Sequence, residues 1–196
     1  MATFGNTEGG TGGGLLAFWV LGMKREFIQG VKDSPTNSGK ANKITCYVKE
    51  NHTPYQEAMC ALYLGSDKSF IASTQTRIIS GASYDWKDFE FANPVDITVQ
   101  DYYICVYGNA PDVDPGTFKG YSLIAYTDDL DVHDYQDNVA DYPNWPDPHT
   151  FSVAVDAGHI QLYCTYTESA GGGTTHISTV GDGKMSTYGL GKFYIK

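Results

Sequence analysis

The chain has 196 residues and a formal net charge of −10, with 14% aromatic and only 18% charged residues. This length suits one domain with extensions. The acidic charge argues against binding to nucleic acid or to an anionic membrane surface, because both need clustered Lys and Arg. The abundance of Tyr and Gly favours β-structure, since aromatic side chains pack well on pleated surfaces and Gly serves the turns.

The chain opens with a glycine-rich tract, residues 1–14, followed by the apolar run "LLAFWVL" at 15–21. This run is far shorter than the roughly 20 residues that a membrane-spanning helix needs. No Lys or Arg precedes it, so the segment does not resemble a secretory signal. We expect residues 1–14 to form an arm whose Phe4 contacts a neighbouring subunit, and the apolar run to enter the domain as an early strand.

Alternation with a period of two residues dominates the rest of the chain. In "KITCYVKE", for example, Ile44, Cys46 and Val48 share one face. Further predicted strands lie in "MCALYLG", "SFIASTQT", "TRIIS", "WKDFEF", "QDYYICVYG", "YSLIAYT", "HIQLYCTYT" and "GKFYIK", with a Pro-marked turn in "ANPVDIT". Many short strands separated by turn signals predict an all-β fold. We expect a two-sheet antiparallel β-sandwich of the jelly-roll type over residues 15–168.

All four cysteines lie inside strand-like runs, and none forms a C-x-x-C pair: Cys46, Cys60, Cys105 and Cys164. Zinc binding and thioredoxin-like chemistry are therefore poorly supported. We favour four buried thiols that pack as small apolar residues. The alternative is a disulfide between strands that happen to lie opposite each other.

A long acidic loop, residues 128–149, lacks strand periodicity. Its carboxylates Asp129, Asp131 and Asp134 are candidate ligands for Ca²⁺, which binds six to eight oxygen atoms in flexible geometry. The spacing does not match an EF-hand loop. A solvated acidic loop without an ion is the favoured interpretation, and we expect no other cofactor.

The same loop carries candidate sugar-binding residues. Tyr142 and Trp145, with Tyr135 nearby, could stack on pyranose rings, while Asp141 and Asp147 could accept hydrogen bonds from hydroxyl groups. In the alternative, Trp145 folds back to cover an edge of the sandwich. We favour this second interpretation, because a long ordered loop needs apolar anchors to offset its loss of entropy.

The C-terminal extension, residues 169–196, begins with a second glycine hinge at 171–173 and ends in "KFYIK". Phe193, Tyr194 and Ile195 give this end strand character. The terminal strand either closes the sheet of its own domain or adds to a sheet edge of a neighbouring subunit. The sequence leaves both alternatives open.

One stretch carries a resemblance to known proteins. It runs from Ala41 to Tyr107 through "ITCYVKE", "CALYLGSDKSFIAST", "YDWKDFEFANPVDIT" and "DYYICVYG". This order is similar to jelly-roll modules of phage virion proteins and of extracellular accessory domains, which bind glycans or build particle surfaces. The resemblance implies a fold more specifically than a function, because one sandwich hosts many roles.

Together with the glycine hinges at both ends, the buried thiols and the acidic charge, the resemblance favours a structural virion protein, either a capsid-decoration or a tail-associated subunit. We expect it to be made in the host cytoplasm without a signal peptide and to contact other virion subunits as a homo-oligomer. The alternative is a carbohydrate-binding module that recognises host glycans with residues 128–149. Neither a G-x-S-x-G motif nor a phosphate-binding loop occurs, and we expect no enzymatic activity.

Overall fold

The computed structural model describes residues 1–7, 27–49, 56–109, 123–124, 126–127, 134–138, 142–151, 153–155, 159–169, 176–180 and 184–188. Every regular element among them is a β-strand, which confirms the predicted all-β class. No helix in this part of the chain has the length and apolar character needed to cross a membrane.

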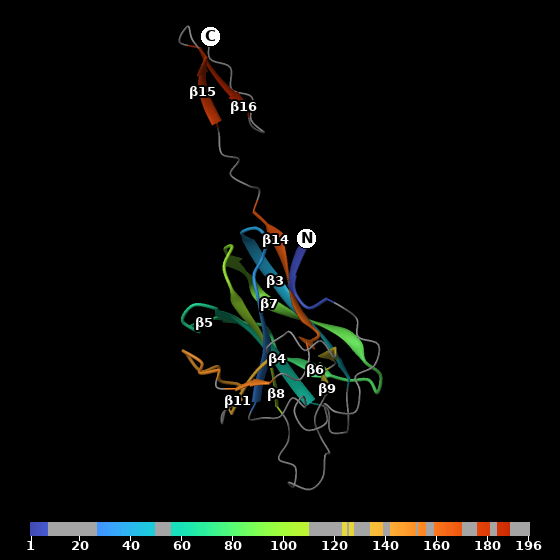
Figure 1. Ribbon diagram of the computed structural model, residues 1–196. Coiled ribbons are helices and arrows are strands. Elements are labelled where there is room, and N and C mark those ends of the chain that lie inside the picture. The colour runs from blue at the N-terminus through green and yellow to red at the C-terminus, as the bar shows by residue number, and fades with distance from the viewer. Residues whose placement is uncertain are drawn as a thin grey trace.

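Two antiparallel sheets pack against each other (Figure 1). The first sheet has the strand order β1 (Ala2–Gly5), β14 (Leu162–Glu168), β3 (Gly39–Lys49) and β7 (Asp85–Ile97), with β9 (Leu123–Ile124) also paired to β3. The second has the order β12 (Val153–Val155), β11 (Asp134–Asn138), β2 (Phe27–Asp33), β8 (Tyr102–Asn109), β4 (Gln56–Leu64) and β5 (Phe70–Ser73), with β6 (Arg77–Ile79) also paired to β4. The β-sandwich is thus confirmed, while its jelly-roll topology stays a prediction.

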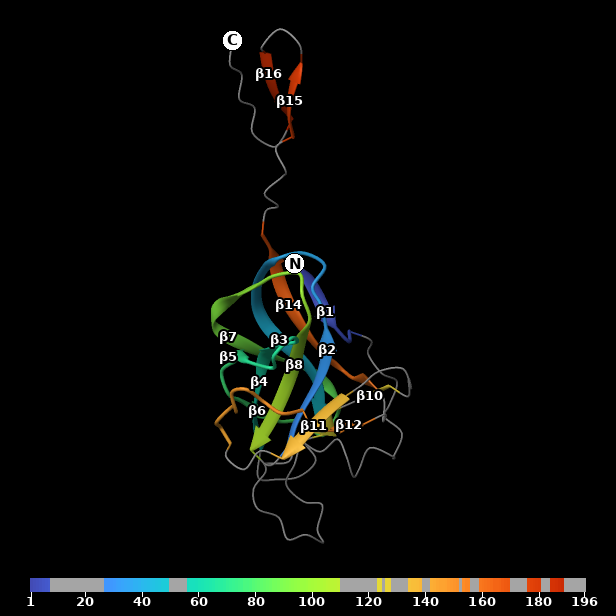
Figure 2. The same ribbon diagram turned by 60° about the vertical axis from the view of Figure 1, so that its left-hand side comes forward.

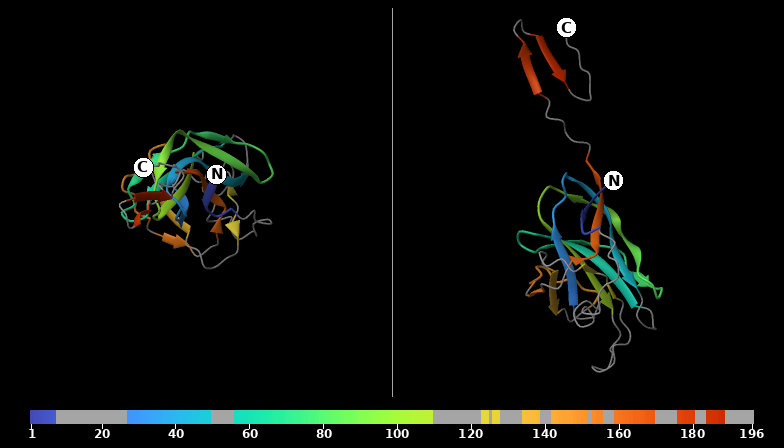
Figure 3. Two further views of the ribbon diagram at one scale, coloured as in Figure 1. Left: turned by 90° about the horizontal axis from the view of Figure 1, so that it is seen from above. Right: turned by 45° about the vertical axis from the view of Figure 1, so that its right-hand side comes forward.

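Two small sheets complete the described strands. β10 (Tyr126–Thr127) pairs with β13 (His159–Ile160). β15 (His176–Val180) pairs with β16 (Lys184–Tyr188) to form a separate hairpin. Figures 1, 2 and 3 show this hairpin beyond the end of the sandwich where the N-terminus lies.

The main core lies between the two sheets and follows the alternation of the sequence. Ile44, Cys46 and Val48 of β3 point inward and are fully buried, as predicted. Cys60 and Leu62 of β4 meet them from the second sheet. Burying such apolar surface is the main driving force for folding, so this core fixes how the two sheets face each other.

A second apolar cluster covers the outer face of the second sheet. Tyr103, Cys105 and Tyr107 of β8 project to this side, where Phe151 and Trp145 pack over the sheet. Strand β8 is therefore buried on both faces, which explains why "YYICVY" is apolar at every position.

Hydrogen bonds occupy part of each lateral edge of the sandwich. On one side, the Gly5 amide donates a hydrogen bond of 2.5 Å to Oδ2 of Asp33, which links β1 to the end of β2. On the other side, the Gln75 amide donates to the Glu90 carbonyl at 2.9 Å, which joins the segment after β5 to β7. Each contact takes up part of an edge that could otherwise pair with another strand.

Two local predictions are wrong, and a third concerns residues that the structure does not describe. "ANPVDIT" is not a turn, because β7 continues through it to Ile97; the register shift between Ala41 and Lys43 accommodates Pro94 on this edge strand. The acidic loop is not free of strands, since β11 lies within it and pairs with β2. The expected strand at 15–21 lies outside the described residues.

Candidate functional site on the outer face of the first sheet

Four half-buried aromatic rings gather on the outer face of the first sheet. We call this group the aromatic face; it consists of Tyr47, Tyr84, Trp86 and Tyr163. The ring of Tyr47 stacks on Tyr84 with centroids 5.6 Å apart and lies 5.0 Å from that of Trp86. Trp86 in turn meets Tyr163 edge to face at 5.1 Å. The rings thus form one continuous aromatic surface.

The strand register explains why these rings meet. Tyr47 of β3 lies directly opposite Trp86 of β7, and Thr45 lies opposite Tyr163 of β14. Alternate residues of a strand share a face, so all of these side chains point away from the core that holds Ile44 and Cys46. Cross-strand aromatic pairs of this kind stabilise a sheet.

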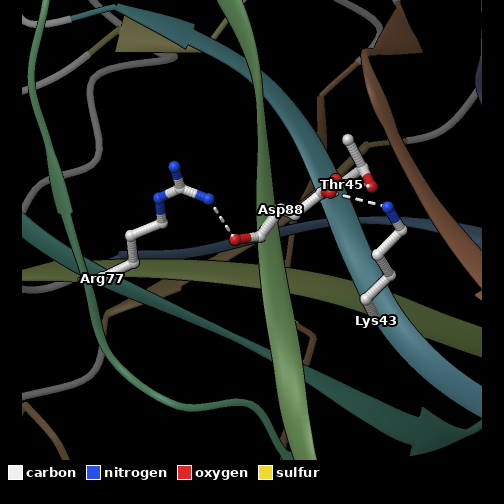
Figure 4. A network of polar contacts seen from close by, with 4 residues as sticks. All are labelled: Lys43, Thr45, Arg77 and Asp88. Carbon is white, nitrogen blue, oxygen red and sulfur yellow. Dashed lines mark hydrogen bonds and ion pairs between the residues drawn. The ribbon is translucent and has the colours of Figure 1, made fainter.

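A polar network continues the same face beside the rings (Figure 4). Lys43 Nζ lies 2.6 Å from Oδ2 of Asp88, and the Thr45 hydroxyl donates to Oδ1 at 2.8 Å. Arg77 approaches from the other side of β7 and donates to the Asp88 carbonyl at 2.7 Å. The carboxylate and the ammonium group are therefore held in place next to the aromatic rings.

The electrostatics of Asp88 follow from these contacts. Partial burial acts to raise the pKa of Asp88, but the hydrogen bonds from Lys43 and Thr45 outweigh it and hold that pKa below its ordinary 3.8. Asp88 is thus an anion at neutral pH, and its charge is balanced by Lys43. A second cation, Lys49, lies over the ring of Tyr84 with Nζ 4.6 Å from the centroid.

Residues 142–151 lie against the second sheet, away from the aromatic face. Trp145 meets the ring of Tyr107 edge to face at 5.5 Å and that of Tyr63 at 6.0 Å. The Tyr63 hydroxyl donates to the Pro146 carbonyl at 3.0 Å. Oδ1 of Asp147 accepts a hydrogen bond from the Phe70 amide at 2.9 Å. Trp145 therefore anchors this segment, but over the outer face of the second sheet rather than at the edge of the sandwich that the sequence suggested.

The other proposed sugar-binding residues are only partly visible. Tyr142 packs edge to face on Tyr107 at 5.0 Å. Tyr135 lies in β11 opposite Gly30 of β2, and Asp141 is outside the described residues. The structure thus brings Tyr142 and Trp145 together as part of an apolar cover, and sugar binding by this loop stays a prediction.

The calcium prediction stays untested. Asp134 begins β11, whereas Asp129 and Asp131 lie outside the described residues. Within the described residues, no group of three His, Cys, Asp or Glu side chains gathers in a way that could hold a metal ion.

Phe4 was expected to contact a neighbouring subunit, but the structure places it in the core of its own chain. Phe4 belongs to β1, which pairs with β14, and only 4% of it is exposed. Its ring lies 5.9 Å from those of Tyr102 and Tyr166 in the main core. The physical reason is that Phe4 is the inward-facing residue of a short strand that completes the first sheet. The other assembly residues, Phe193, Tyr194 and Ile195, lie outside the described residues.

The cysteines are all free and buried, which confirms the favoured interpretation. Cys46 and Cys60 face each other across the main core with their sulfur atoms 3.5 Å apart. Burial raises the pKa of the Cys60, Cys105 and Cys164 thiols well above its ordinary value, so they stay protonated. A thiol that stays protonated is a poor nucleophile, and these residues therefore serve packing.

The aromatic face was missed by sequence reasoning, although a signal exists. Tyr47 and Trp86 occupy the outward positions of their strands, where an exposed antiparallel sheet usually carries polar residues. Large outward aromatics in two strands were therefore informative. Only the register of β3 with β7 and β14 shows that they meet.

Comparisons of the chain with protein-family models, with curated proteins and with solved structures found no match.

Proposed function

We propose that this protein is a structural subunit of a particle, of the kind that decorates a phage capsid or belongs to a phage tail. It acts through contacts between subunits rather than through catalysis. The resemblance of residues 41–107 to virion modules supports this proposal, and the arrangement of the C-terminal hairpin carries it.

The β15–β16 hairpin is the supporting observation. Its two strands pair with each other from His176↔Tyr188 to Val180↔Lys184 and form a sheet of their own among the described residues. A lone two-stranded hairpin is marginally stable in water, so it gains from adding to a further strand. The outer edge of each strand carries backbone donors and acceptors suited to such addition.

The edges of the sandwich are partly occupied by contacts within the same chain. Along β7, the Asp88 carbonyl accepts from Arg77 and the Glu90 carbonyl accepts from Gln75. At the opposite edge, β1 is tied to Asp33 through Gly5. Because these edges are partly occupied, we propose that the hairpin pairs with the hairpin of another copy or with another subunit of the particle.

The test measures the molar mass of the protein by size-exclusion chromatography with light scattering over a series of concentrations. We expect the full chain to associate as its concentration rises. A variant lacking residues 174–196 and the point variant Ser178→Pro should stay monomeric. Ser178 lies mid-strand opposite Ser186, where proline fixes φ and removes a backbone donor. The matched control Ser178→Ala retains that donor and should associate like the full chain.

Residues 1–14 are kept in all of these proteins, because Phe4 belongs to the core and removing it would destabilise the sandwich. Thermal unfolding of each variant should match that of the full chain, since the hairpin forms a sheet apart from the sandwich. The proposal is contradicted if the full chain stays monomeric at its highest soluble concentration and also fails to bind particles that lack it.

A further inference from the structure

We infer that the aromatic face of the first sheet, together with the Lys43–Asp88 pair beside it, is a binding site for an uncharged carbohydrate chain. This inference goes beyond the proposed assembly role and does not depend on the hairpin. It also concerns the sheet opposite to the one that residues 142–151 cover.

The aromatic part of the site suits the C–H face of a pyranose ring. The four rings come from β3, β14, the start of β7 and the residue just before β7, and all are half-buried, so each keeps part of its surface open to solvent. Their contacts with one another, at 5.0 to 5.6 Å between centroids, fix their positions. Rings that are already fixed lose little conformational freedom on binding, which favours affinity.

The polar part of the site suits the hydroxyl groups of the same sugar. The Asp88 side chain is 41% exposed and that of Lys43 is 31% exposed, so both are reachable from solvent. An ionised carboxylate offers about four lone-pair sites and an ammonium group three donors. Lys43 and Thr45 engage one site on each carboxylate oxygen. The remaining sites leave an acceptor and a donor side by side for neighbouring hydroxyl groups.

The register places the polar and aromatic parts within the reach of one sugar chain. Trp86 and Asp88 are two residues apart on the same face of β7, a separation of about 7 Å along a strand. Thr45 lies between Asp88 and Tyr163 in the neighbouring strands. A pyranose ring over Trp86 and Tyr163 would therefore turn its hydroxyl groups toward Asp88 and Lys43.

The charges beside the rings favour a sugar over a protein surface. The centres of protein–protein interfaces are depleted of charged residues, because desolvating an ion pair is costly. Sugar hydroxyl groups instead hydrogen-bond to both charges. The four rings are also few compared with the roughly 20–30 residues that each partner contributes to a stable protein interface.

The charge balance favours an uncharged sugar. On this face the two cations Lys43 and Lys49 are balanced by two carboxylates: Asp88 pairs with Lys43, and Glu90 lies opposite Lys43 in the register of β3 and β7. The whole chain carries a formal charge of −10. Uronic and sialic acids would therefore be repelled, whereas neutral hexoses and N-acetylhexosamines would not.

The test uses the full chain on an array of neutral and acidic glycans, followed by calorimetric titration with the neutral oligosaccharide that binds best. We expect binding to neutral glycans and none to their uronic acid counterparts. Trp86→Ala and Tyr163→Ala should each weaken binding by about tenfold or more, because each removes a stacking surface. Trp86→Phe keeps a ring and should retain most of the affinity.

Asp88→Asn keeps the size of the side chain and should also weaken binding, so the test does not depend on a ring whose loss affects folding. The matched control is Tyr103→Phe on the outer face of the second sheet, which should leave the affinity unchanged. Binding to no neutral glycan overturns the inference. Glycan binding that survives in both Trp86→Ala and Asp88→Asn also overturns it. If Trp86→Ala binds sugar normally but no longer associates with its own copies, the aromatic face is a contact between copies instead of a sugar site.

Discussion

Phe4→Ala tests whether the first strand belongs to the fold of its own chain. Phe4 is 4% exposed and its ring contacts Tyr102 and Tyr166, each with centroids 5.9 Å apart. Truncating a buried Phe to Ala costs about 3–5 kcal/mol of unfolding free energy. The two aromatic contacts contribute about 0.5–1.5 kcal/mol each within that loss.

The position of β1 sets an upper bound on this effect. Only four residues form the strand, which pairs with β14 at the edge of the sheet. In the variant, β1 can detach while the rest of the sandwich stays folded, and the loss cannot then exceed the free energy of docking β1. We therefore expect a loss of about 3 kcal/mol, at the low end of the range for Phe→Ala.

The assay is urea unfolding of the full chain followed by intrinsic fluorescence. The control is Thr3→Ala on the same strand, which changes an exposed side chain and should cost less than about 1 kcal/mol. If β1 detaches in Phe4→Ala, the m-value falls as well, because less surface is buried in the folded state. A loss below about 1 kcal/mol for Phe4→Ala would refute the placement of Phe4 in its own core. It would restore the expectation that Phe4 contacts a neighbouring subunit.

Three further predictions follow from the described contacts. Trp145→Ala should lower the unfolding free energy by about 2–4 kcal/mol in urea titrations, whereas a solvated loop would lose almost nothing. A thiol reagent at neutral pH should label none of the four cysteines in the native protein and all four in urea; fast labelling of the native protein would contradict their burial. Asp88 has a lowered pKa, so its ion pair stabilises the fold above pH 3.8 and this stabilisation is lost as the pH falls further. The stability difference between the wild type and Asp88→Asn should therefore shrink in acid, and a constant difference down to pH 2 would contradict this linkage.

The alternation of the sequence was enough to predict the strands of the main core. In β3 the apolar residues at alternate positions point into the space between the sheets, because a strand has a side-chain period of two. β4 and β8 carry apolar side chains on both faces, so for them the sequence predicted a strand but not which face is inward. The free, buried state of the cysteines followed from the same pattern. The anchoring role of Trp145 followed from the entropy of a long loop.

Strands with polar sequences could not be predicted in this way. β11 reads "DYQDN" and β2 reads "FIQGVKD", and neither has a clear apolar face. β11 is held by backbone hydrogen bonding between β2 and β12, which depends on its neighbours rather than on its own residues. The continuation of β7 past Pro94 also depends on its place at the edge of the sheet.

By itself, the sequence determined the all-β class, the inward face of β3 and the packing role of the cysteines, because these depend on local alternation and on the burial of apolar surface. The tertiary structure decided which outward residues meet. Tyr47, Trp86 and Tyr163 come from three strands far apart in the chain, and only the pairing of those strands brings their rings together beside Lys43 and Asp88. It also placed Phe4 in the core rather than in an external arm, because the ring of Phe4 is buried by β14 and β8, which are far from it in the sequence.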